Sequence, residues 1–158
     1  KKRNMEKKKK SIILLVFFGL FIIAWFVIAQ FQPKQEEYNR PSPEEVVRLY
    51  FTSWNDNNYP DMYSTISDGF KRIEPTAKNL DAFKAYISSL KIKAVDIVNI
   101  QEASNDGTIA IVDYTVEFTT EDGEKIPSKN EFTLKNKEGD IIQGWKLIHP
   151  YGDYSDMT

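Results

Sequence analysis

Three short runs of residues have the types and the order that serine acyl-transfer enzymes use. Ser88–Lys91 fits the pattern S-x-x-K, Ser128–Asn130 fits S-x-N, and Lys137–Gly139 imitates K-T-G. That chemistry requires the serine, the lysine and the strand motif to converge in one large domain. Here the first run falls at a predicted helix end, the second in a strand and the third in a turn. We therefore interpret the match as a coincidence.

A second set of side chains could transfer protons next to a carbonyl group, as a tyrosine and a carboxylate do in a pocket. Its members are Tyr50, Tyr63, Tyr114 and Asp61, with Asp113 and His149 less well placed. Tyr50 and Tyr114 fall on apolar faces, where aromatic rings usually form core. Asp61 falls in a first helical turn, where the helix dipole favours a carboxylate. We predict that the protein is not an enzyme, with a small pocket isomerase or hydratase as an alternative.

Composition narrows the chemistry further. The chain has no cysteine, which excludes disulfides, thiolate metal sites and cysteine nucleophiles. Its single histidine, His149, excludes a multi-histidine zinc site. The seven glycines do not cluster into a phosphate-binding loop, and Asn105–Gly107 lacks the spaced ligands of a calcium loop. We therefore expect no metal and no cofactor.

An apolar run near the N-terminus predicts a membrane helix. Residues 12–29 are eighteen residues without a charge or a strongly polar group, and residues 11–31 reach the roughly 20 residues that cross a bilayer. Residues 1–10 carry seven of the 21 basic residues, which favours a cytoplasmic tail. We expect a tail at 1–10, a transmembrane helix at 11–31 and a C-terminal domain outside the cell membrane. The alternative is secretion after cleavage near Ala29.

The remaining chain predicts a linker and one domain. Residues 32–42 are polar and contain two prolines, which is typical of a spacer. Residues 11–158 hold 14 basic and 22 acidic residues, so we expect no nucleic acid partner. Residues 43–150 form the domain, and residues 151–158 are expected to be a solvated tail.

Helical periodicity predicts three helices in the first half of the domain. One begins at Pro43, because Ser42 and Glu45 form a capping box and an apolar face follows as far as Trp54. A short helix follows at residues 60–66, and a third spans residues 79–90. Residues 67–78 are expected to form a loop.

The second half alternates with a period of two residues and predicts four antiparallel strands. They are expected at residues 92–102, 110–118, 126–136 and 141–150, and the last has Trp145, Leu147 and His149 in phase. The first strand changes phase between Ile97 and Val98, which indicates a bulge or burial of both faces. The predicted fold class is α+β, a transmembrane helix followed by a cone-like domain of three helices packed on a curved four-stranded antiparallel sheet.

Several segments of the chain resemble a known family. They are residues 43–67 (PEEVVRLYFTSWNDNNYPDMYSTIS), 81–90 (DAFKAYISSL), 108–120 (TIAIVDYTVEFTT) and 144–150 (GWKLIHP). This order resembles the nuclear transport factor 2-like superfamily, and within it the N-terminal non-catalytic domain of methicillin-resistance-type penicillin-binding transpeptidases. The resemblance implies a cone-shaped domain with a cavity between sheet and helices. The candidate cavity-lining residues are Tyr50, Trp54, Tyr63, Tyr114 and Trp145.

The resemblance also implies a role at the bacterial cell envelope. We expect a membrane-anchored, extracytoplasmic module that binds an envelope protein or a small apolar ligand. A homodimer formed through the sheet face is a further expectation. The alternative binding role is a component of a conjugation or secretion channel, because such channels also use domains of this kind behind one membrane helix.

Overall fold

The computed structural model describes residues 40–158. The predicted cytoplasmic tail, the transmembrane helix and most of the linker lie outside these residues. Among residues 40–158, no helix has both the length and the apolarity that crossing a bilayer requires.

Helix α2 (Pro43–Asn55) begins at the predicted capping box. The Ser42 hydroxyl accepts a hydrogen bond from the Glu45 backbone N–H at 3.2 Å, and the Glu45 carboxylate accepts one from the Ser42 N–H at 2.7 Å. The helix buries Val46, Val47, Tyr50 and Phe51 on one face. The predicted start and apolar face of this helix are therefore confirmed.

The structure adds helical turns where the sequence predicts a loop. Helix α3 (Tyr59–Ser64) and helix α5 (Leu80–Ser89) match the other two predicted helices, but α4 (Asp68–Ile73) and the 3₁₀ turn η1 (Pro75–Ala77) occupy residues 67–78. The predicted loop is therefore wrong. A six-residue helix is too short to show apolar periodicity, and its start depends on one cap, in which the Ser67 hydroxyl accepts from the Phe70 N–H at 3.1 Å.

The four strands form one antiparallel sheet in the order β1-β2-β3-β4. Their bounds are β1 (Ile92–Asn105), β2 (Ile109–Thr120), β3 (Lys125–Lys137) and β4 (Gly144–Leu147). The pairing of β1 with β2 shifts register between Ile97 and Asn99, and Val98 is 69% exposed. The predicted bulge is therefore confirmed, and its extra residue faces solvent.

Strand β4 is shorter than the sequence predicts. It covers four residues instead of 141–150, and His149 is exposed where the predicted phase would bury it. Lys146 is buried instead, because its Nζ donates to the Ser64 carbonyl at 2.5 Å. Leu147 joins α3 to the sheet, since its N–H donates to the Thr65 carbonyl at 2.9 Å. Contacts with the helices, and not regular alternation, therefore determine which side chains of this strand are buried.

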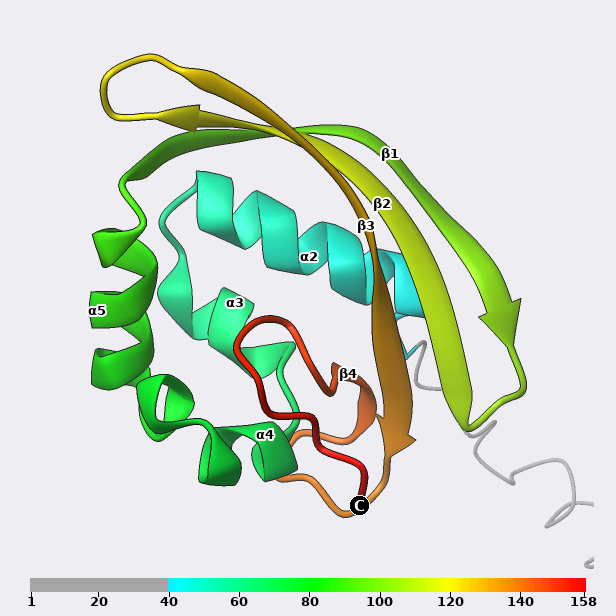
Figure 1. The fold of residues 1–158 in the computed structure, drawn as a ribbon. Coiled ribbons are helices and arrows are strands. Elements are labelled where there is room, and N and C mark those ends of the chain that lie inside the picture. Colours follow the sequence, from blue (N-terminus) through cyan, green and yellow to red (C-terminus); the bar gives the residue numbers. More distant parts are fainter. Residues whose placement is uncertain (1–39) are drawn as a thin grey trace, which may run out of the picture. The chain divides into compact units, whose positions relative to one another are not determined.

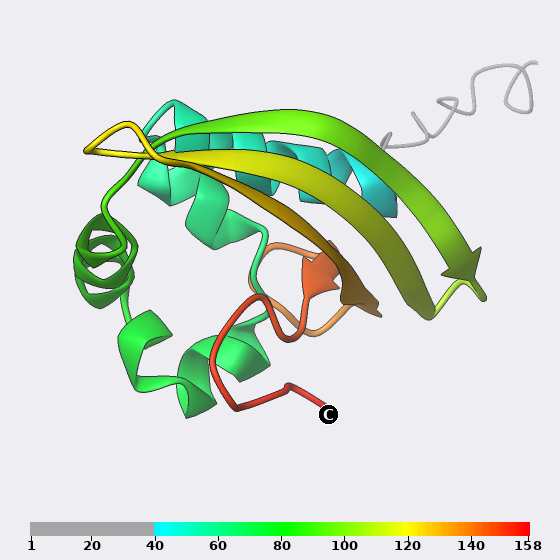
Figure 2. The same cartoon turned by 45° about the horizontal axis from the view of Figure 1, so that its top comes forward.

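The sheet curves around the helices, which lie on its concave side (Figure 1). A second view shows α5 standing at the end of this concavity near the hairpin that joins β2 and β3 (Figure 2). Phe51, Met62, Phe83, Val112 and Leu134 are fully or almost fully buried between the two layers. The α+β class, with helices packed on a four-stranded antiparallel sheet, is confirmed.

Two residues of the C-terminal segment, Tyr151 and Asp156, pack on the domain, while residues 152–155, 157 and 158 are exposed as expected of a solvated tail. Asp156 is 3% exposed, and its carboxylate lies 2.9 Å from the Lys137 Nζ. The Asp156 N–H donates to the Ile148 carbonyl at 2.9 Å. Tyr151 stacks on Tyr86 of α5 with ring centroids 4.5 Å apart. These contacts involve side chains that local sequence patterns do not pair.

Candidate functional site

The concave side of the sheet encloses a small cavity with aromatic walls, which we call the aromatic cavity. Its volume is about 170 Å³. Its walls carry aromatic and aliphatic side chains and no carboxylate or imidazole. They are Tyr50, Phe51, Trp54, Tyr86, Ile87, Leu90, Tyr114, Phe118, Phe132, Pro150 and Tyr151.

The walls of the aromatic cavity come from distant parts of the chain. Four elements and the C-terminal segment supply its walls. Helix α2 contributes Tyr50 and Trp54 one turn apart, whose rings meet edge to face with centroids 6.0 Å apart. Tyr114 of β2 and Phe132 of β3 are cross-strand neighbours on the concave face, with centroids 4.5 Å apart.

The cavity gathers four tyrosines, and each keeps its proton at neutral pH. Burial raises the pKa of Tyr50 well above its ordinary value, with smaller contributions from Tyr151, Tyr114 and Tyr86. Burial also raises the pKa of Tyr86 and Tyr114, and it raises that of Tyr151 to about 12. The hydroxyls are therefore neutral groups that can donate a hydrogen bond to a ligand.

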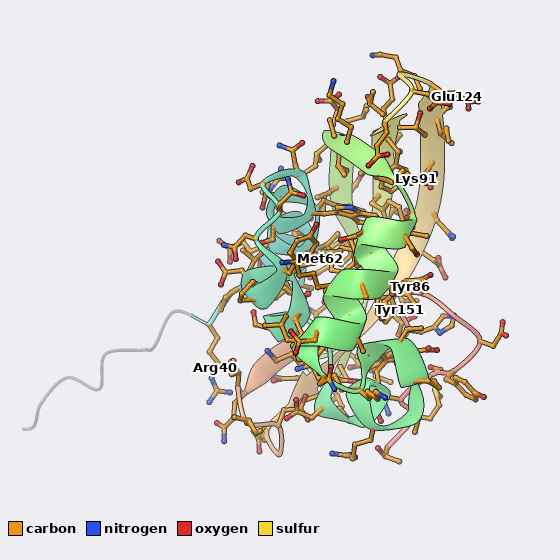
Figure 3. The ribbon with its side chains drawn as sticks, turned by 90° about the vertical axis from the view of Figure 1, so that its left-hand side faces the viewer. Arg40, Met62, Tyr86, Lys91, Glu124 and Tyr151 are labelled. Atoms are coloured by element: carbon orange, nitrogen blue, oxygen red, sulfur yellow. The ribbon has the colours of Figure 1, made fainter. Side chains whose placement is uncertain are left out.

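The C-terminal segment closes one side of the cavity. Tyr151 lies beside Tyr86 of α5 in the side view (Figure 3), and the two rings are nearly parallel, at 24°. On the other side of this segment is a shallow pocket of about 330 Å³, which includes His149 and Glu131. Tyr114, Phe132, Pro150 and Tyr151 line both spaces. Pro150 and Tyr151 therefore form part of the wall between the aromatic cavity and the outer pocket.

A second hollow, which we call the lysine groove, lies near α3 and α4. Its volume is about 440 Å³, and it is lined by Pro60, Tyr63, Ser64, Asp68, Lys71, Leu80, Ile141, Ile142 and Lys146. Its rim is apolar and open to solvent, because Ile141 is 93% exposed and Ile142 is 57% exposed. The groove therefore combines an apolar edge with charged side chains.

The charges in the lysine groove neutralise one another. Asp68 accepts from the Lys71 Nζ at 3.1 Å and from the Ile141 N–H at 2.7 Å. Burial would raise the pKa of Asp68, but these two contacts outweigh it and lower the pKa. Burial, and then the charge of Lys71, lowers the pKa of Lys146. Asp140 lies nearby and accepts from the Asp68 N–H at 2.9 Å. Two carboxylates therefore face two lysines, and the groove has no strong net attraction for an anion.

The structure distributes the predicted cavity residues over two sites. Tyr50, Trp54 and Tyr114 line the aromatic cavity together. Tyr63 lines the lysine groove instead, and its hydroxyl donates to the Ala77 carbonyl at 2.8 Å. Trp145 is half-buried against the core and lines neither space.

The carboxylates considered for catalysis, Asp61 and Asp113, do not line the aromatic cavity. His149 meets Tyr114 only in the outer pocket. Asp61 is exposed, and its carboxylate accepts from the Asn58 side chain at 2.7 Å. Asp113 is exposed on β2, and the exposed His149 has its Nδ1 2.5 Å from the Tyr154 carbonyl oxygen. Lys137 is engaged by Asp156. Among residues 40–158, no three acidic or histidine side chains are grouped to hold a metal ion.

The predicted cavity residues include three of the eight aromatic side chains in this wall and omit the other five. Phe118 and Phe132 fall on the apolar phase of their strands, so the alternation of β2 and β3 contains a signal for both. Tyr86 precedes the buried Ile87 on α5 and belongs to the same apolar side. Tyr151 has no local signal, because it lies beyond the last strand and only the folded chain places it beside Tyr86.

One curated protein is similar in sequence to most of this chain. Penicillin-binding protein 3 of Bacillus subtilis (strain 168) is 24% identical over 143 residues, which cover 87% of this chain and 20% of that protein. The chain therefore spans about a fifth of the length of this relative.

Two solved structures are similar in part. A SEC-C motif containing protein from Rhodopseudomonas palustris has a TM-score of 0.49 at 13% identity, covering 68% of this chain and 75% of that one. A protein of the NTF2-like family from Streptomyces avermitilis has a TM-score of 0.41 at 9% identity, covering 65% and 86%. The family described as the NTF2-like N-terminal transpeptidase domain matches residues 42–151, and the chain belongs to this family.

Proposed function

We propose that the chain is a membrane-anchored, extracytoplasmic binding module of the bacterial cell envelope without catalytic activity of its own. The observation that carries the non-catalytic part is the lining of the aromatic cavity, which holds neutral tyrosines and no carboxylate or imidazole. General acid–base chemistry needs a group whose pKa lies near the working pH. The tyrosine pKa values move away from that range.

The anchored, outward orientation is supported by the N-terminal sequence. Residues 12–29 are apolar, and the seven basic residues of the first ten precede them. The relative in Bacillus subtilis is a penicillin-binding protein. A module of the same family held at the outer face of the membrane would have envelope proteins as its neighbours.

Apolar side chains on the surface support a binding role. Ile141 and Ile142 stand beside the lysine groove, 93% and 57% exposed. Exposed apolar groups that lie next to a hollow are typical of protein contact sites. The expected partner is an envelope protein that covers this rim.

Cysteine labelling in intact cells tests the orientation, because the natural chain has no cysteine and one introduced thiol is a unique label. Val98→Cys places the thiol at a position that is 69% exposed, and Lys8→Cys places it in the basic N-terminal segment. A membrane-impermeant maleimide should label the first variant in intact cells and the second only after lysis. Val112→Cys, at a fully buried position, controls for unfolded protein. Protection of Val98→Cys in intact cells would overturn the proposed orientation.

Photo-crosslinking tests the binding role. A photoreactive residue at Ile141 should capture one envelope protein reproducibly, and the same residue at Val98, on a different part of the surface, should not. Equal capture of many proteins from both positions, or capture of none, would contradict a specific contact at the lysine groove.

A further inference from the structure

One polar group of the aromatic cavity is the Tyr50 hydroxyl. Tyr50 is only 2% exposed and lies on the wall of the aromatic cavity. Within residues 40–158 the Tyr50 hydroxyl makes no hydrogen bond to the protein. The unpaired polar atoms closed off from solvent there are Asn136 Oδ1 and Asp156 Oδ2, so the Tyr50 hydroxyl borders the open space of the cavity. Buried tyrosine hydroxyls usually find a hydrogen-bond partner, because a lost hydrogen bond in the interior is costly. A donor that opens into an otherwise apolar hollow can bond to an acceptor on a molecule that enters it.

We propose that the aromatic cavity binds a small uncharged molecule that has an apolar body and one hydrogen-bond acceptor, which receives the Tyr50 hydroxyl. This inference deepens the binding role proposed above and rests on it only for its biological setting. The aromatic walls would enclose the apolar body, and Tyr50 would fix its orientation.

The size of the cavity limits the guest. A hollow of about 170 Å³ is comparable with the roughly 150 Å³ apolar cavity that holds a benzene molecule in an engineered protein. The guest is therefore about the size of one substituted ring or a branched chain of similar volume. A peptide or a sugar chain is too large to enter it.

The charge of the guest follows from the walls. The cavity lining has no acidic or basic side chain, so a charged guest would lose its hydration without gaining a counter-charge. A quaternary ammonium ion is the one cation that aromatic walls alone could hold. It has no acceptor for the Tyr50 proton, so the unpaired hydroxyl favours a neutral guest.

Two probe molecules of equal shape separate the hydrogen bond from apolar burial. Para-cresol and para-xylene differ only by a hydroxyl in place of a methyl group. The full chain in lipid nanodiscs is labelled with ¹³C at its isoleucine methyl groups, and each probe is titrated with its free aqueous concentration measured. Ile87 lines the cavity and reports binding, while Ile109 lies outside it and serves as an internal control.

We expect both probes to shift the Ile87 methyl signal, and the hydrogen bond from Tyr50 to strengthen para-cresol binding by about threefold to tenfold, the range for one net hydrogen bond. Tyr50→Phe should lower the affinity for para-cresol relative to para-xylene by about threefold to tenfold, because the para-cresol hydroxyl then loses its partner. Tyr59→Phe is the matched control, because its hydroxyl bonds to Asn57 outside the cavity, and it should leave the ratio of the two affinities unchanged.

Three results would overturn the proposal. They are an unchanged ratio of the two affinities in Tyr50→Phe, no Ile87 shift with either probe, and tighter binding of tetramethylammonium than of para-cresol. None of them affects the cysteine labelling or the crosslinking from Ile141, so failure of the cavity and failure of the proposed function are distinguishable.

Discussion

Gly69 of α4 and Asp156 of the C-terminal segment approach so closely that no side chain fits between them. A Cβ atom built on Gly69 would lie 2.2 Å from the Asp156 Cγ. The Asp156 carboxylate is also held by Lys137 at 2.9 Å and by the Thr158 hydroxyl at 2.6 Å. The last residues of the chain are therefore fixed to α4 and β3 by one buried carboxylate.

We predict that Gly69→Ala releases the C-terminal segment. The added methyl group must displace Asp156, and overpacking of this kind costs about 1–3 kcal/mol. The higher helix propensity of alanine returns about 1 kcal/mol or less, so the variant should remain less stable. Thermal unfolding of the full chain in nanodiscs measures the difference. Gly139→Ala is the control, because its Cβ meets nothing within 4 Å and its stability should stay within about 0.5 kcal/mol.

The contribution of Asp156 should depend on acidity. Burial alone would raise its pKa, but hydrogen bonds from Thr158, Lys137 and Ser67 outweigh burial and lower it to about 2. The ordinary value is 3.8, so the stabilisation is complete above about pH 4 and disappears as the pH falls towards 2. Asp156→Asn should be less stable than the natural chain at pH 7, and the gap should close between pH 4 and pH 2. A gap of constant size would contradict this assignment.

Removing the hydroxyl should have different effects on the stability of the protein at two tyrosines of the domain. The Tyr63 hydroxyl donates to the Ala77 carbonyl at 2.8 Å, so Tyr63→Phe should cost about 0.5–1.5 kcal/mol. Tyr50→Phe removes an unpaired group and should leave the stability of the ligand-free protein unchanged or slightly raised. Urea unfolding of both variants compares them directly. A larger loss in Tyr50→Phe than in Tyr63→Phe would show that the Tyr50 hydroxyl has a partner within the fold.

One side-chain hydrogen bond at each end of helix α2 joins it to strand β1, and each bond can be removed separately. The Glu44 carboxylate accepts from the Glu102 N–H at 2.6 Å, and the Asn55 side chain accepts from the Val95 N–H at 3.1 Å. Glu44→Ala should speed hydrogen exchange at Glu102 and leave Val95 unchanged, and Asn55→Ala should do the reverse. Each variant therefore controls the other. Equal acceleration at both amides would indicate that the whole strand loosens as one unit.

The extent to which the sequence predicts this fold depends on how local the signals are. The capping box at Ser42 and the alternation through Val112, Tyr114 and Val116 are local, and they predict α2 and β2 well. Helix α4 and strand β4 depend on partners from distant parts of the chain, such as Ser64 for the Lys146 amine. Alternation alone therefore assigns Lys146 to solvent, although it is buried.

The residues of the candidate site could likewise be predicted only in part from local signals. Tyr50, Trp54 and Tyr114 follow from apolar faces on α2 and β2, and the structure places them in one cavity. Tyr151 closes that cavity only because the segment after β4 turns back towards α5. When contacts with distant parts of the chain place a side chain, the residues next to it in the sequence show no periodic pattern that predicts its position.

The irregular path of β1 has a consequence for the chain in a crowded environment. β1 is an outer strand of the sheet, and its pairing with β2 shifts register at three places. A flat outer strand offers evenly spaced amides and carbonyls on which another copy could add its own strand. The shifts break that spacing, and Glu44 and Asn55 occupy two of the amides. Neighbouring copies at high concentration therefore meet an edge that does not template the growth of a continuous intermolecular sheet.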